Sequence, residues 1–227
     1  MSILGIDIGT TTITALLLSE NRGRLIDKVT LKNDSFISGD LHFARLQDPE
    51  VILDIVIEAV TKITDGSDVS AIGVTGQMHG ILYLDENNAP ASPLFTWQDL
   101  RGNEKFEGGL TYAEYLTENT GYKAATGFGL TTHFYNLKNR LVPKRARKIS
   151  TIHDYIVSHL TDSAPVTHSS DAASLGFYDL RHHQFDNVAL LEAGIDPEIL
   201  PKVIKNTRIA GTTKCEFLPD GIPVSVA

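Results

Sequence analysis

Short apolar runs broken by polar turns dominate the first third of the chain. Residues 3–8 and 12–18 are apolar enough for buried strands, and a turn of three residues separates them. Residues 25–31 form a third apolar run after a polar loop. The pattern therefore predicts that the chain opens with a three-stranded antiparallel meander.

A helix and a fourth strand are expected next. Asp48 suits the N-cap of a helix and Pro49 its first position. The apolar residues that follow recur at helical spacing: Ile52, Ile55, Val56, Ala59, Val60 and Ile63. Residues 69–74 then have the composition of a buried strand. A strand, a helix and a strand in this order predict a parallel crossover within a mixed sheet.

The second half of the chain is richer in helical patterns. Stop signals and apolar spacing predict helices over 112–119, 133–141, 152–160 and 187–192, and residues 221–227 have a strand-like composition. There is no internal repeat and no linker-like tract. The prediction is one α/β domain over residues 1–227, with a helical insertion in its second half.

Composition narrows the possible partners. The 20 Lys and Arg residues against 28 Asp and Glu residues give a net charge of −8, which argues against broad nucleic-acid binding. No apolar run approaches the roughly 20 residues that span a bilayer, and the N-terminus has no secretory leader. Cys215 is the only cysteine. We expect a cytoplasmic protein without membrane or nucleic-acid partners.

The first candidate site is the turn between the first two strands. Gly9 allows a sharp turn and close approach to a ligand, and the hydroxyls of Thr10, Thr11 and Thr12 follow it. Amide and hydroxyl groups at such a tip suit phosphate oxygens, and Asp7 at the strand end could hold Mg²⁺ through water. The alternative is a plain hairpin in which the Asp accepts turn hydrogen bonds.

The second candidate follows the strand at 69–74. Two glycines, Gly76 and Gly80, bracket Gln77, Met78 and His79. Ligands often bind at strand ends in α/β sheets, and the Gln and His side chains offer donors and acceptors for sugar hydroxyls. The alternative is a hairpin with a solvated histidine.

The third candidate centres on Trp97, the only tryptophan, with Asp99 and Arg101 close behind it. An aromatic face suits a sugar ring, and Asp99 and Arg101 could hydrogen-bond hydroxyls or pair with each other. The alternative, which the segment by itself favours, is a core tryptophan beside a surface ion pair.

The three segments, in this order, resemble the N-terminal domain of the FGGY carbohydrate kinases, which have the actin-like, ribonuclease-H-like ATPase fold. The segments 126–134 and 170–176, and the position of Ile209-Ala210-Gly211, are most similar to sedoheptulokinase-type members. The Gly76–Gly80 segment is similar to that of xylulokinase-type members. The resemblance covers nearly the whole chain.

The resemblance also implies roles for individual residues. Thr10 and Thr11, in the loop with Gly9 and Thr12, would contact the phosphates of ATP, and Asp7 would help to place Mg²⁺. Met78 and His79 would contact the sugar, with Gln77 and Asp99 nearby, and Phe128 would line the sugar cleft. Asp171 is a further candidate, although an Asp at the start of a helix is usually a cap.

The implied activity is transfer of the γ-phosphoryl group of ATP to a hydroxyl of a ketose such as sedoheptulose. The alternatives are a kinase of the pentuloses xylulose or ribulose, and a non-catalytic actin-like domain that senses a sugar. Family members carry their catalytic base, an Asp in a Gly-Asp motif, in a second nucleotide-binding domain. We expect that domain beyond Ala227, so that residues 1–227 alone would be inactive. A homodimer is also possible.

Overall fold

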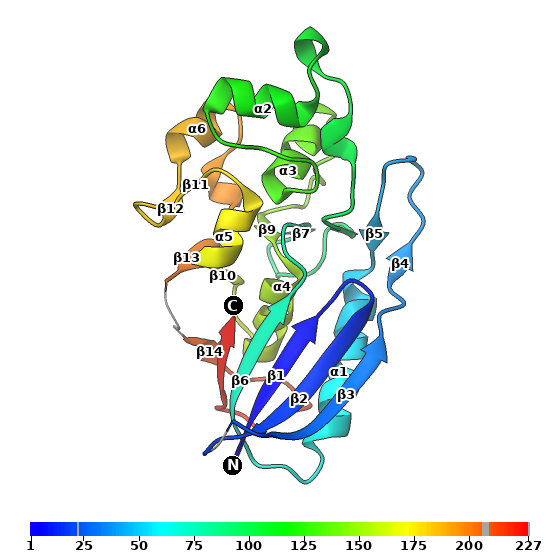
Figure 1. The fold of residues 1–227 in the computed structure, drawn as a ribbon, viewed down its shortest axis with the longest axis vertical. Coiled ribbons are helices and arrows are strands. Elements are labelled where there is room, and N and C mark those ends of the chain that lie inside the picture. Colours follow the sequence, from blue (N-terminus) through cyan, green and yellow to red (C-terminus); the bar gives the residue numbers. More distant parts are fainter. Residues whose placement is uncertain (22, 206–208, 227) are drawn as a thin grey trace.

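A computed structural model describes residues 1–21, 23–205 and 209–226. Its lower half is built on a six-stranded mixed sheet (Figure 1). The strand order across the sheet is β14 (Ile209–Thr212), β15 (Pro223–Val226), β6 (Val69–Gly76), β1 (Ser2–Ile8), β2 (Thr12–Ser19) and β3 (Leu25–Lys32). β1, β2 and β3 pair antiparallel, whereas β1, β6 and β15 run parallel. The predicted meander and crossover are confirmed.

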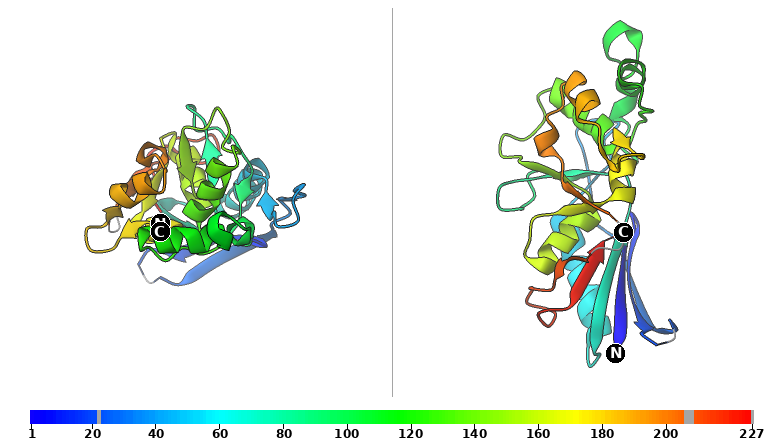
Figure 2. Two further views of the ribbon diagram at one scale, coloured as in Figure 1. Left: turned by 90° about the horizontal axis from the view of Figure 1, so that it is seen from above. Right: turned by 90° about the vertical axis from the view of Figure 1, so that its left-hand side faces the viewer.

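Two helices cover one face of this sheet. Leu4, Ile6 and Ile8 of β1 point to that face and are buried, because side chains alternate along a strand. The helices are α1 (Pro49–Thr64) and α4 (Ile152–Thr161), which lie on the same side in Figure 2. Asp48 caps α1 as predicted, since its side chain accepts hydrogen bonds from the first-turn amides.

The upper half is mainly helical and has a second apolar core. Its helices are α2 (Tyr112–Thr120), α3 (Gly129–Lys138), α5 (Ser169–Leu175) and α6 (Asn187–Glu192). The short strands are β4 (Phe36–Ile37), β5 (Leu46–Gln47), β7 (Leu82–Leu84), β8 (Leu94–Phe95), β9 (Lys148–Ser150), β10 (Val166–His168), β11 (Tyr178–Asp179), β12 (Gln184–Phe185) and β13 (Lys202–Ile204). Single 3₁₀ turns occur at Arg101–Asn103, Glu107–Gly109 and Pro197–Ile199. The predicted helical insertion is thus present.

Two local predictions need correction. The helix predicted over 133–141 begins at Gly129 and ends at Lys138, because Phe128 is already in the extended conformation of an N-cap. α5 was not among the helices predicted from apolar spacing, since its seven residues are too short to show a helical period, and only the cap interpretation of Asp171 implied it. Within the described residues, none of the helices is long and apolar enough to span a membrane.

Candidate functional site

The turn between β1 and β2, residues 9–11, is held from behind by two amide side chains. Asn33 Nδ2 donates to the Gly9 carbonyl at 2.9 Å, and Gln47 Nε2 donates to the Thr10 carbonyl at 3.0 Å. The backbone amide of Asn33 also donates, to the Thr11 carbonyl at 2.9 Å. Because all three carbonyls of this Gly-Thr loop bond to the protein, its outer surface is left to amides and hydroxyls. That arrangement suits phosphate oxygens.

Thr10 joins this loop to the two other candidate segments. Its hydroxyl donates to Gln77 Oε1 at 3.3 Å and accepts from Trp97 Nε1 at 3.1 Å. Gln77 Nε2 in turn donates to Gln47 Oε1 at 2.8 Å, so the buried Gln77 side chain belongs to the frame of the site. Gln77 and Trp97 lie 67 and 87 positions from Thr10 in the sequence. The three candidate segments therefore meet at the Thr10 hydroxyl.

Asp7 lies near the carboxyl end of β1, on the sheet face opposite to α1 and α4. Its strand partners are Thr14 on β2 and Thr75 on β6. Asp7 is exposed, and no hydrogen bond or ion pair to its carboxylate occurs among the described residues. A free carboxylate beside the Gly-Thr loop fits a hydrated Mg²⁺ ion, which keeps most of its waters and takes one or two protein carboxylates.

The metal would have few protein ligands at this place. Within residues 1–21, 23–205 and 209–226, no group of three or more His, Cys, Asp or Glu residues could hold a metal ion. Thr11 and Thr12 are exposed at the same end of the hairpin.

The Gly76–Gly80 segment holds His79 in an unusual backbone conformation, with φ at 70°. Such angles are uncommon for residues other than glycine and recur at functional sites. The His79 ring stacks on Phe128, with centroids 4.6 Å apart and planes 8° from parallel. His79 Nδ1 lies 2.7 Å from the Ser174 carbonyl. The neighbouring Met78 is 45% exposed, which leaves it free to contact a ligand.

Close backbone packing puts Phe128 in this position. A Cβ atom at Gly127 would lie 2.1 Å from the Trp97 carbonyl oxygen, and φ at Gly127 is 83°. A Cβ atom at Gly129 would lie 2.9 Å from the His79 carbonyl oxygen. Only glycine fits at both places, so the 126–130 segment is pressed against the two other predicted segments.

Asp99 pairs with Arg101, which is one of the two roles predicted for it, and its carboxylate is not left free for a sugar hydroxyl. Its side chain is fully buried, and Arg101 holds it through two bonds, Nε to Oδ1 at 2.7 Å and Nη2 to Oδ2 at 3.0 Å. The Arg45 amide donates to Oδ2 as well. The alternative interpretation was wrong, since the ion pair is buried whereas Trp97 is 47% exposed. Both carboxylate oxygens therefore accept hydrogen bonds from Arg101 or Arg45, which leaves neither of them for a sugar hydroxyl.

Asp171 is not the cap of its helix. The N-cap of α5 is His168, whose Nδ1 accepts from the Ser170 amide. The buried Asp171 carboxylate instead lies 3.4 Å from Nε2 of His153, which is also buried. Sequence reasoning missed this histidine, and it missed Asn33, Gln47 and Ser174. Nothing local marks them, because their partners are far away in the sequence.

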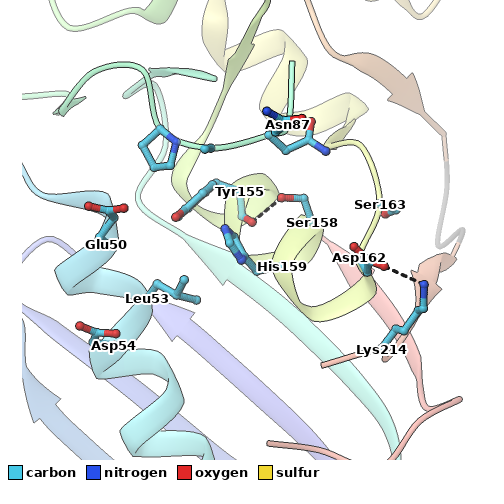
Figure 3. Close-up of a pocket in the computed structure, with 13 residues that line it drawn as sticks. Glu50, Leu53, Asp54, Asn87, Tyr155, Ser158, His159, Asp162, Ser163 and Lys214 are labelled. Atoms are coloured by element: carbon cyan, nitrogen blue, oxygen red, sulfur yellow. Dashed lines mark hydrogen bonds and ion pairs between the residues drawn. The ribbon is translucent and has the colours of Figure 1, made fainter. Parts of the chain in front are cut away.

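A separate pocket of about 420 Å³ lies between α1, α4 and the 87–90 loop (Figure 3). Glu50 and Asp54 line one side of it, and Tyr155 and His159 of α4 lie at its centre. Burial lowers the pKa of His159, so its ring favours the neutral form. None of the predicted site residues lines this pocket.

Comparison with known proteins identifies related domains. The N-terminal domain model of the FGGY family of carbohydrate kinases matches residues 2–227. The chain is 28% identical to a xylulose kinase of Streptomyces rubiginosus, over 93% of this chain. It is 30% identical to the sedoheptulokinase of Mus musculus over 99% of this chain, and 30% identical to the gluconokinase of Bacillus subtilis over 91%.

Solved structures show the same fold. A gluconate kinase from Lactobacillus acidophilus superposes with a TM-score of 0.84 at 24% identity, covering 99% of this chain and 47% of its own. A xylulose kinase from Rhodospirillum rubrum also gives 0.84, at 20% identity. The chain spans about half the length of its relatives, with 44%, 52% and 41% of the three curated proteins covered. The predicted actin-like α/β fold is confirmed.

Proposed function

Because the chain belongs to the FGGY family of carbohydrate kinases and matches its N-terminal domain, we propose that it is the sugar-binding half of an enzyme that transfers the γ-phosphoryl group of ATP to a ketose hydroxyl. The observation that carries the proposal is the position of Thr10. Its hydroxyl bonds to both Gln77 and Trp97, so hydrogen bonds to one oxygen join the loop suited to phosphates to the segments suited to a sugar.

Each part of the site has a task in this reaction. The Gly-Thr loop binds phosphate oxygens through its outward amides and through the hydroxyl of Thr11. Asp7 would hold a Mg²⁺ ion through water, and that ion would supply positive charge against the phosphates of ATP. Met78, His79 and Phe128 line the sugar side, with the exposed face of Trp97 beside Thr10. The protein's contribution is position and charge, since phosphoryl transfer needs little covalent help.

We assign the catalytic base and most of the nucleotide site to a second domain of the whole polypeptide. Neither carboxylate near the sugar side is free to act as the base, because Asp99 is bound on both oxygens and Asp171 pairs with His153. This domain would be the main partner of residues 1–227, and closure of the two domains would exclude water from the reaction.

The proposed acceptor is a ketose of the sedoheptulose type. The support is the match to the mouse sedoheptulokinase, which extends over 99% of this chain. A pentulose acceptor is the second candidate, because xylulose kinases of four bacteria match at 26–32% identity. Both candidates require the same Gly-Thr loop, so they differ only in the sugar pocket.

Steady-state kinetics on the whole encoded polypeptide tests the proposal. We expect ATP-dependent ADP release with sedoheptulose, with a lower kcat/KM for xylulose, ribulose and gluconate. A higher kcat/KM for xylulose or ribulose would make the protein a pentulokinase. Sugar binding without phosphorylation of any of the four compounds would contradict the kinase proposal and favour a sensor.

A further inference from the structure

The contact between His79 and Ser174 defines the protonation of the imidazole. The Ser174 carbonyl oxygen can only accept a hydrogen bond, so Nδ1 of His79, at 2.7 Å, must carry the proton. In a neutral ring the other nitrogen, Nε2, is then an acceptor. Across the described part of the chain, Nε2 has no hydrogen-bond partner. His79 therefore has a free acceptor available on the predicted sugar side.

The Ser174 carbonyl is available because it ends a helix. Ser174 lies in the last turn of α5, where carbonyl groups have no partner within the helix. The negative end of the helix dipole also favours an N–H donor at this point. A second contact supports the first, since the His79 amide donates to Ser174 Oγ at 3.4 Å. The end of α5 thus fixes both the ring and the backbone of His79.

A buried charged pair fixes α5 in turn. Asp171, on the same helix, lies 3.4 Å from His153 on α4, and Ser174 Oγ donates to the Asp171 carbonyl at 2.8 Å. His153 also lies under the start of the sugar-side segment, because a Cβ atom at Gly76 would come within 3.1 Å of its Nδ1. The pair therefore contacts α5, whose end binds His79, and lies against the start of the Gly76–Gly80 segment, which carries His79.

The surroundings favour the charged form of this pair. Burial lowers the pKa of His153, but the contact with Asp171 and the charges of Asp154 and Asp171 outweigh it and raise that pKa. Burial raises the pKa of Asp171, but His153 outweighs this and lowers it. Burial raises the pKa of Asp154, whose two oxygens have no partner in the described residues. The two groups lie 3.4 Å apart in the buried interior without a formal hydrogen bond to His153, so an ion pair links α5 to α4.

We propose that Asp171 and His153 are positioning residues that hold α5 against His79, so that His79 keeps its proton on Nδ1 and accepts a hydrogen bond from a substrate hydroxyl at Nε2. The proposal deepens the proposed function and rests on it for the identity of the ligand. It also defines what the pocket recognises at this point. A neutral acceptor binds a hydroxyl group and repels a carboxylate, so His79 would face a hydroxyl of the sugar.

The first test measures the histidine rings directly. The whole polypeptide, labelled with ¹⁵N in its histidines, is studied by two-bond ¹H–¹⁵N correlation at pH 7.5, with His79→Gln to assign the signal. We expect the wild-type His79 ring in the Nδ1–H form, and an increase of the Nε2–H form in Asp171→Asn. Asp179→Asn is the matched control, because it removes a carboxylate from the exposed pair with His182. It should leave the His79 signals unchanged.

The second test separates positioning from general stability. In Asp171→Asn we expect the KM for the sugar to rise about tenfold, the loss of roughly one hydrogen bond, while the KM for ATP stays within twofold. His153→Gln should act in the same direction. Where either variant fails to fold, the wild-type spectrum alone decides, because an Nε2–H ring at His79 would overturn the proposal. An unchanged tautomer and an unchanged sugar KM in folded Asp171→Asn would also overturn it.

The two proposals can fail separately. A wild-type protein that phosphorylates none of the tested compounds would refute the kinase function, whereas the His79 spectrum would still report on the positioning role.

Discussion

At Thr10, a single hydroxyl group connects the Gly-Thr loop to the sugar side of the site. It donates to Gln77 and accepts from Trp97, which fills its donor position and one acceptor position. Residues that share an atom in this way couple energetically, so substitutions at them do not add. The hydroxyl therefore orients the tryptophan ring rather than acting alone on a ligand.

A double-mutant cycle on Thr10→Val and Trp97→Phe tests this coupling. Trp97→Phe keeps an aromatic face but removes the Nε1–H donor. We expect each single variant to lower kcat/KM for the sugar several-fold, and the double variant to lose less than the product, with a coupling of about 1 kcal/mol. The measurement is steady-state kinetics of the whole polypeptide. If the loss of kcat/KM in the double variant equalled the product of the two single losses, the hydrogen bond between Thr10 and Trp97 would not contribute to activity.

Asp7 offers a different kind of test, because its carboxylate forms no hydrogen bond or ion pair within the described residues and is free to act on a ligand. We expect Asp7→Asn to lower kcat roughly 100-fold, as losses of transition-state charge stabilisation do, while the sugar KM changes little. Asp27→Asn, an exposed carboxylate on β3, is the control and should leave both constants unchanged. A kcat for Asp7→Asn equal to that of the wild type would refute the metal-positioning role.

At the scale of elements, the site depends on how closely three backbone segments approach. Gly127 is the tightest point, with φ at 83° and the Trp97 carbonyl where a Cβ atom would lie. Gly108 is the matched control, because its φ is 63° but no atom lies within 4 Å of an added Cβ. Alanine at either position would have a strained positive φ, but only at position 127 would its Cβ atom also collide with the Trp97 carbonyl.

We expect Gly108→Ala to lower the free energy of unfolding by about 1 kcal/mol and Gly127→Ala to lower it by at least about 3 kcal/mol. Urea unfolding at pH 7 measures both values. The difference between them reports the collision with Trp97. Equal losses in the two variants would show that the 126–130 segment moves away without cost.

The elements built from neighbouring residues were predictable from the sequence. The meander and α1 follow from local apolar patterns and from the capping residue Asp48, which need no knowledge of distant contacts. The Gly-Thr loop was predictable for the same reason. The network around it was not, because Gln47 lies 37 positions from Thr10, and Ser174 lies 95 positions from His79.

The segment from Trp97 to Arg101 shows the limit most clearly. Its charged residues are ones that usually lie at the surface, and its tryptophan is a type that is usually buried. The fold reverses both, because Arg101 finds Asp99, Asn136 and the Phe95 ring within the upper core. Only the partners decide which side chain is buried, and these come from other parts of the chain.

At the scale of the molecule, the candidate site lies between two cores. One core packs β1, β2 and β6 against α1 and α4, and the other packs the helices of the upper half. The upper core contains a polar chain in which Arg101 donates to Asn136 Oδ1, and Asn136 Nδ2 donates to the Tyr83 hydroxyl. That hydroxyl is left to donate to His133 Nδ1, at 2.9 Å. His133 is therefore neutral in the folded protein.

This arrangement predicts how the stability of the whole chain depends on pH. Burial lowers the pKa of His133 to about 4, below the value of about 6.5 in an unfolded chain. Because the unfolded state binds the proton first, the contribution of His133 is complete above pH 6.5. It is lost as the pH falls to 4, by about 3 kcal/mol in total.

Urea unfolding of the wild type, His133→Gln and the exposed control His183→Asn, each from pH 7.5 to pH 4, measures this contribution. Carboxylates titrate in all three proteins, so the difference between the profiles isolates the histidine. We expect His133→Gln to be less stable at pH 7.5, where the Tyr83 bond is lost, but to lose about 3 kcal/mol less than the wild type on acidification. His183→Asn should follow the wild type. Parallel profiles for all three proteins would mean that His133 can take up a proton without disturbing the upper core.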